Sequence, residues 1–155
     1  MNKTVILLLM LVSIALISPL KSISQTKSFD EPIEYNDYII GLQNEIGVEI
    51  QAFISAVTND GKSDALASLN NLIAVIDKKI TDLSNLSDFE GNTEFRDAGL
   101  ELFKFYKSIA VNEYKEFVEI KFKEIADDDD NTKLEEIVKR IQENEKEYDE
   151  VFLNA

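Results

Sequence analysis

The sequence predicts an all-α protein, an up-down-up-down four-helix bundle that follows an N-terminal signal peptide. Apolar residues recur every three or four positions in four stretches, the connections are short, and only 5 Gly and 2 Pro occur in 155 residues. Because 45% of the residues are hydrophobic, the chain can bury one core. We divide it into a signal peptide at 1–24, a tail at 25–31 and a bundle domain at 32–155.

The first residues have the pattern of a secretory signal peptide. Lys3 precedes an uncharged apolar run, Val5–Ile17, which is shorter than the roughly 20 residues that a membrane span needs. Ser22 and Ser24 supply small residues at the −3 and −1 positions, which places cleavage before Gln25. We therefore expect an exported protein (periplasmic, on the cell surface or extracellular) with no membrane insertion of the mature chain. A retained N-terminal anchor is the alternative.

The first two helices are predicted at Pro32–Thr58 and Asp64–Leu83, separated by a break at Asn59-Asp60-Gly61. Each has an apolar seam with the spacing of one helix face. The seam of the first is Tyr35, Ile39, Leu42, Ile46, Ile50, Phe53 and Val57. The seam of the second is Leu66, Leu69, Ile73, Ile76, Ile80 and Leu83. Leu86 and Phe89, in the connection that follows, are expected to cover one end of the core.

The third and fourth helices are predicted at Glu94–Ala126 and Lys133–Leu153. In the third, the apolar face shifts by one residue after Ile109, which we interpret as the drift of a long helix against a seven-residue repeat. Thr132 and Glu135 have the spacing of a capping box at the start of the fourth helix. A pair of helical hairpins that completes its core only in a dimer is the alternative, so we expect a monomer or a dimer.

Composition excludes most catalytic chemistry. The chain has no His and no Cys, which removes His/Cys zinc sites, Fe–S clusters, disulfides and nucleophiles activated by histidine. No glycine-rich phosphate loop occurs. The 30 acidic residues against 16 basic ones give a net charge of −14, which opposes nucleic-acid binding. We expect no enzymatic activity, no cofactor and no nucleic-acid partner.

The run Asp127-Asp128-Asp129-Asp130-Asn131 between the third and fourth helices partly matches a calcium-binding loop. Oxygen ligands stand at alternate positions, but Thr132 replaces the turn glycine and Val138 replaces the bidentate acid. A solvent-exposed loop before a helix N-terminus is the simpler interpretation, and it is the one that we favour.

Three glutamates interrupt or border the apolar seams: Glu49 on the first helix, Glu113 on the third and Glu145 on the fourth. Counting from the helix ends places them roughly 14–20 Å down the bundle, in one layer. Carboxylates that converge from several helices can bind metals, and without histidine the ion would be Ca²⁺, Mg²⁺ or Mn²⁺. These residues are candidate metal ligands. The alternatives are a polar layer that fixes helix register and side chains that extend to solvent.

Aromatic residues gather on the third helix. Phe105 and Phe117 fit its core face, whereas Phe103 and Phe122 point away from the main stripe. Phe103 and Phe122 would therefore cover loop ends or form an exposed patch that binds a partner.

The signal peptide, Gln25 at the new terminus, the opening Tyr35-Asn36-Asp37-Tyr38-Ile39-Ile40 and the acidic four-helix pattern resemble uncharacterised exported surface proteins of bacteria, of the Bacteroidetes type. The resemblance spans residues 30–153 and carries over no catalytic residue. It implies an exported, non-enzymatic helical bundle that acts as a binding or surface-interaction module for an unknown protein or small molecule. The alternatives are a carboxylate-lined cation-binding bundle and a carrier of small apolar ligands.

Overall fold

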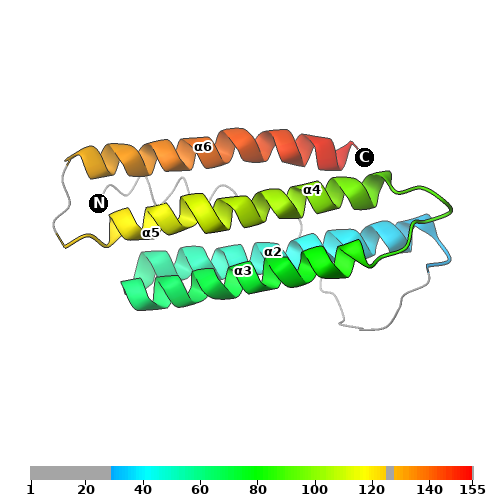
Figure 1. Ribbon diagram of the computed structural model, residues 1–155, viewed down its shortest axis with the longest axis horizontal. Helices are drawn as coiled ribbons and strands as arrows, with labels where there is room; N and C mark the ends of the chain where they lie inside the picture. The colour runs from blue at the N-terminus through cyan, green and yellow to red at the C-terminus, as the bar shows by residue number, and fades with distance from the viewer. Residues whose placement is uncertain (1–28, 125–127, 155) are drawn as a thin grey trace.

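A computed structural model describes residues 29–124 and 128–154, and these residues form four antiparallel helical rods, as predicted (Figure 1). The rods are α2 (Pro32–Asn59), α3 (Lys62–Ser84), a composite third rod and α6 (Asp128–Leu153). The third rod consists of α4 (Glu94–Ile109), the π-helical turn η2 (Ala110–Tyr114) and α5 (Lys115–Lys121). The expected signal peptide lies outside the described residues. Among the described helices, none has the length and apolar character of a membrane span.

Neighbours in sequence are neighbours in space. α2 packs against α3, α3 packs against the third rod, and α6 packs against α4 and α5 (Figure 1). All seven residues of the seam predicted for α2 are buried, and so are Leu134, Ile137, Val138 and Ile141 of α6. Leu86 is buried and Phe89 packs against the core, which confirms that the connection before α4 covers one end.

The ends of the last two rods differ from the prediction. The third rod ends at Lys121 instead of Ala126, and α6 begins at Asp128 instead of Lys133. The aspartates from Asp128 to Asp130 therefore lie in the first turn of α6, where the helix dipole stabilises negative charge. Thr132 lies inside the helix, so the predicted capping box does not start it.

The seam of α3 is rotated relative to the prediction. Leu72 and Lys79 are buried, whereas Leu66, Ile73 and Ile80 are only partly buried. A lysine can take a core position because its four-carbon stem packs against apolar neighbours while its ammonium group finds a charged partner. The apolar spacing alone did not reveal this position.

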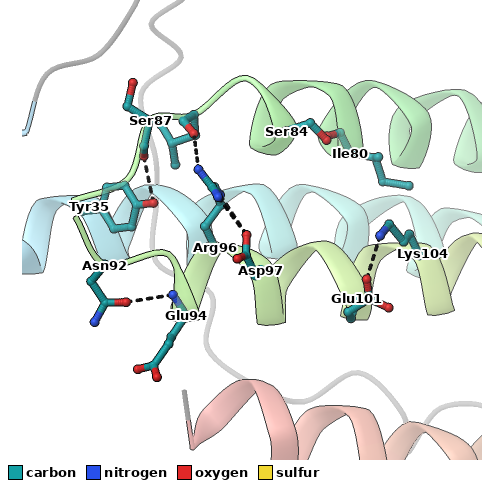
Figure 2. Close-up of polar contacts among 11 residues, drawn as sticks. Tyr35, Ile80, Ser84, Ser87, Asn92, Glu94, Arg96, Asp97, Glu101 and Lys104 are labelled. Carbon is teal, nitrogen blue, oxygen red and sulfur yellow. Dashed lines mark hydrogen bonds and ion pairs between the residues drawn. The ribbon is translucent and has the colours of Figure 1, made fainter. Parts of the chain in front are cut away.

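The α3–α4 connection is held by polar contacts from two helices (Figure 2). The Tyr35 hydroxyl of α2 donates to the Ser87 carbonyl at 3.1 Å, and Arg96 of α4 donates to the Leu86 carbonyl at 3.0 Å. The turn itself contains Glu90 at φ 53° and Gly91 at φ 85°, left-handed conformations that glycine adopts without strain. The connection is thereby fixed to both α2 and α4.

Gly99 marks the closest approach of the rods at this end. A Cβ at this position would lie 3.0 Å from Leu83 of α3, 3.3 Å from Ile39 of α2 and 3.5 Å from Phe152 of α6. Glycine therefore lets side chains from the other three rods meet on the surface of α4.

Candidate functional site

The middle of the bundle contains a polar layer to which three rods contribute. Gln43 Nε2 of α2 donates to the Tyr106 hydroxyl of α4 at 3.3 Å. Tyr106, Tyr114 of η2 and Glu145 of α6 line the same small cavity, together with apolar side chains from α2 and α3. The cavity measures about 10 Å³, which is enough for at most one water molecule. The layer is packed, and it leaves no room for a larger ligand.

The π-turn explains why Tyr114, and not Glu113, belongs to this layer. In an uninterrupted α-helix, the residue four positions after the buried Ile109 would continue the same face, and that residue is Glu113. The π-turn contains one extra residue, so that Tyr114 occupies the buried position and Glu113 is only half-buried. The phase change seen in the sequence is real, but a single π-turn absorbs it, and not gradual helix drift.

Electrostatics within the layer favour a neutral Tyr114. Burial, and then the nearby Glu145 carboxylate, raise the pKa of Tyr114 well above its ordinary value. The ring stacks on Phe53 with a centroid distance of 4.8 Å. Tyr114 is therefore a protonated structural residue at neutral pH, and it is not a candidate nucleophile or base.

The three candidate metal ligands are not gathered into a metal centre. Within residues 29–124 and 128–154, no group of three or more His, Cys, Asp or Glu side chains is placed to hold a metal ion. Glu49 accepts a hydrogen bond of 2.6 Å from Asn71 of α3, whereas Glu145 lines the central cavity and Glu113 lies in the π-turn. Helix arithmetic placed them at similar depths but could not give the direction in which each side chain points.

The predicted calcium-binding alternative for residues 127–131 is also not supported. Residues 128–131 are helical, so they cannot wrap around an ion as a loop does. Asp130 is fully buried and pairs with Lys123. Asp127 lies outside the described residues.

A shallow groove of about 270 Å³ lies on the outer face between α2 and α3. Val48 and Val75 contribute apolar surface, and Glu45 pairs with the buried Lys79 at its edge. The positive and negative side chains in this groove compensate one another. Its charge therefore favours no particular class of ligand.

Of the two alternatives for Phe103 and Phe122, the exposed aromatic patch is not present. Phe103 is completely buried, and Phe122 is partly buried against the core with Lys121 over its ring at 5.3 Å. The prediction for Phe103 was wrong because α4 packs against more than one rod, so that more than one side of this helix is buried.

Lysines hold together the end of the bundle at which α2 ends and α3 begins. Lys62 of α3 pairs with Glu119 of α5 at 2.5 Å. Lys121 of α5 donates to the Val57 carbonyl in the last turn of α2, and burial lowers the pKa of Lys121. A cation near this carbonyl satisfies an acceptor that the helix itself leaves free.

The same end carries two further lysine pairs, which involve the start of α6. Lys123 pairs with the buried Asp130, and Lys133 pairs with Asp129 one turn away on α6. Together with the two contacts above, these pairs connect α2, α3, α5 and α6. We call this end the lysine end.

The opposite end, where α2 and α4 begin and α6 finishes, is the acidic end (Figure 1). Two ion pairs here, Arg96 with Asp97 and Lys146 with Glu150, each lie within one helix, and Glu31, Glu34 and Glu90 are exposed. Aromatic rings close this end instead. Phe29 packs on Tyr35 at 5.4 Å, Phe95 on Phe152 at 4.8 Å, and Phe105 on Tyr148 at 4.1 Å between centroids.

Comparison of the chain with protein-family models, with curated proteins and with solved structures gave no match. Interpretation of the site therefore depends on the geometry of this chain alone. The packed centre gives no support to a carrier of apolar ligands, because such carriers need cavities of several hundred Å³.

Proposed function

We propose that the protein is an exported, non-enzymatic helical bundle that acts by binding a partner on its outer surface. The observation that carries this proposal is the exposure of large apolar side chains on a bundle whose centre is filled. They are Ile33, Val48, Val111, Tyr148, Val151 and Leu153. Neighbouring exposed apolar side chains are typical of interaction sites, and Tyr148 and Val151 are neighbours three residues apart on α6.

The absence of a reactive constellation among the described side chains supports a binding role. Glu145, the acid beside the central cavity, lines it together with Tyr106 and Tyr114, and burial holds Tyr114 in its neutral form. Glu49 is engaged with Asn71, and Asp130 is engaged with Lys123. Each of these contacts joins structural elements.

Export is part of the proposal and depends on residues 1–24. If they form a cleaved leader, the protein recovered outside the cytoplasm begins at Gln25, which N-terminal sequencing measures. An intact N-terminus on protein that stays in the cytoplasm would contradict export without touching the binding role.

A scan with a photo-cross-linking amino acid tests the binding role in the native host. The amino acid is introduced singly at the exposed valines Val48, Val111 and Val151, with the exposed Lys139 as a polar reference. We expect a reproducible covalent adduct from at least one valine position and none from Lys139. If no position gives an adduct in cells that make the folded protein, the binding role is wrong.

A further inference from the structure

We propose that the last two turns of α6 bind a basic amphipathic helix of a partner protein. We call this surface the α6 tip and define it as Glu147, Tyr148, Glu150 and Val151. The inference rests on the proposed function and adds to it the location of the surface and the chemistry of the partner.

The α6 tip exposes more apolar surface than a helix end needs. Val151 is 57% exposed and Tyr148 is 36% exposed, although Phe152, next to Val151, is buried. Tyr148 lies one turn before Val151 on a neighbouring part of the helix surface, and its ring stacks on Phe105 of α4. Core packing thus holds a rigid base, Phe152 and the Tyr148 ring, beneath the exposed side chains.

The charges of the α6 tip oppose the stability of its own helix. The C-terminal end of a helix dipole favours cations, yet the last turn of α6 contains no basic residue and Glu147 and Glu150 are exposed there. The nearest basic partner is Lys146, which lies 3.9 Å from Glu150 and is itself 79% exposed. Such a local conflict is expected at sites that serve binding and not folding.

The surroundings extend the same negative field. The first turns of α2 and α4 lie at the same end of the bundle, and the stack of Phe95 on Phe152 joins α4 directly to the α6 tip (Figure 1). These first turns contribute the exposed acids Glu31, Glu34 and Glu94. Several uncompensated charges of one sign raise the local concentration of an oppositely charged partner.

The exposed apolar side chains and the negative charge of the α6 tip together indicate the chemistry of the partner. The lysines and arginines of a basic helix would pair with Glu147 and Glu150. Its apolar face would cover Tyr148 and Val151, which lie three residues apart on one side of α6. Charge complementarity argues against a second copy of this chain, because two acidic tips repel each other. It argues equally against anionic lipid.

Fluorescence anisotropy with a designed peptide tests the proposal on the full chain. The probe is a labelled helical peptide of about five turns with lysine on one face and leucine on the other. We expect saturable binding that weakens as salt rises. The variants Val151→Ser, and Glu147→Gln with Glu150→Gln, should each weaken binding by about fivefold or more.

Two matched controls make the test specific. Glu135→Gln with Glu136→Gln removes the same charge from two exposed acids in the first half of α6, and it should leave binding within about twofold. A peptide of the same composition in scrambled order should bind at least about fivefold more weakly. Equal weakening by the control variant, or equal binding of the scrambled peptide, would show unspecific charge attraction and overturn the proposal. Circular dichroism verifies that each variant is folded. If the serine variant is unfolded, the comparison of the two charge variants alone still tests the proposal.

Failure of this inference is distinguishable from failure of the proposed function. Adducts from Val48 or Val111 without any from Val151 would preserve the binding role and remove the α6 tip as its site. An adduct between two copies of this chain through Val151 would replace the basic partner by self-association. No peptide binding and no adduct at any position would contradict both.

Discussion

At the lysine end, charged side chains join four helical segments, whereas at the acidic end aromatic rings do so and the acidic side chains face solvent. The contrast is clearest within α6, whose first turn buries Asp130 against Lys123 and whose last turns expose Glu147 and Glu150. One helix thus carries negative charge at both ends, with a buried ion pair at its start and only the exposed pair of Lys146 with Glu150 at its finish. The two ends of the bundle therefore differ in how far basic side chains compensate the acidic ones. The net charge of −14 describes the whole chain and does not show this difference.

The largest effect is expected from breaking the aromatic closure of the acidic end. Phe152 is 2% exposed and stacks on Phe95, so Phe152→Ala should lower the free energy of unfolding by about 3–5 kcal/mol. Chemical denaturation measures the change. A loss below about 1 kcal/mol would mean that the rings do not hold this end together.

At the lysine end, the buried carboxylate should matter more than the exposed one beside it. Asp130→Ala removes a buried acceptor of a charged hydrogen bond, and it should cost about 1.5–3 kcal/mol of unfolding free energy. Its matched control is Asp129→Ala, which removes a carboxylate that is 70% exposed and should cost about 0–1 kcal/mol. Equal effects in thermal or chemical unfolding would show that the buried ion pair contributes no more to the lysine end than the exposed one.

Between the ends, the pH dependence of unfolding reports on the central layer. Because the folded-state pKa of Tyr114 is raised above the unfolded value near 10, the folded protein keeps a proton that the unfolded chain loses above pH 10. Stability should therefore fall with rising pH there, by up to about 1.4 kcal/mol per pH unit from this group. Tyr114→Phe should show a shallower fall between pH 10 and 11, measured by urea unfolding. An identical slope would place the Tyr114 hydroxyl in a solvent-like environment.

The smallest effect concerns divalent cations. Because the described glutamates form no metal-binding group, Ca²⁺, Mg²⁺ and Mn²⁺ should change the melting temperature only as a generic salt does. Glu113→Gln with Glu145→Gln should respond to these ions as the parent chain does. A rise in melting temperature that saturates with one ion and disappears in the double variant would restore the cation-binding alternative.

The sequence predicted the fold well where one helix face decides burial. Every predicted seam residue of α2 is buried, because one continuous apolar stripe faces a single core. The prediction failed at Lys79 of α3, since its burial depends on Glu45, a partner on another helix that no local pattern indicates. Phe103 is a similar case, because α4 contacts more than one neighbour.

The candidate site could be predicted only in part. Spacing along the helices correctly identified Glu145 as a residue near the middle of the bundle. It could not show that Glu113 gives way to Tyr114, since a π-turn changes the direction of side chains without changing the apolar composition of the segment. The start of α6 was misplaced because a run of aspartates is as compatible with a loop as with a helix N-terminus.

The π-turn has a consequence for how this chain tolerates insertions and deletions. Removal of one residue between Ala110 and Tyr114 would convert the π-turn into ordinary α-helix and would keep Phe117 and Val118 in the interior, because the turn holds the one extra residue. Removal of one residue from the middle of α3, which is α-helical throughout, would instead rotate the rest of that helix by about 100°. The π-turn is thus a place in the third rod at which one codon can be lost while α5 keeps the same side toward the other rods.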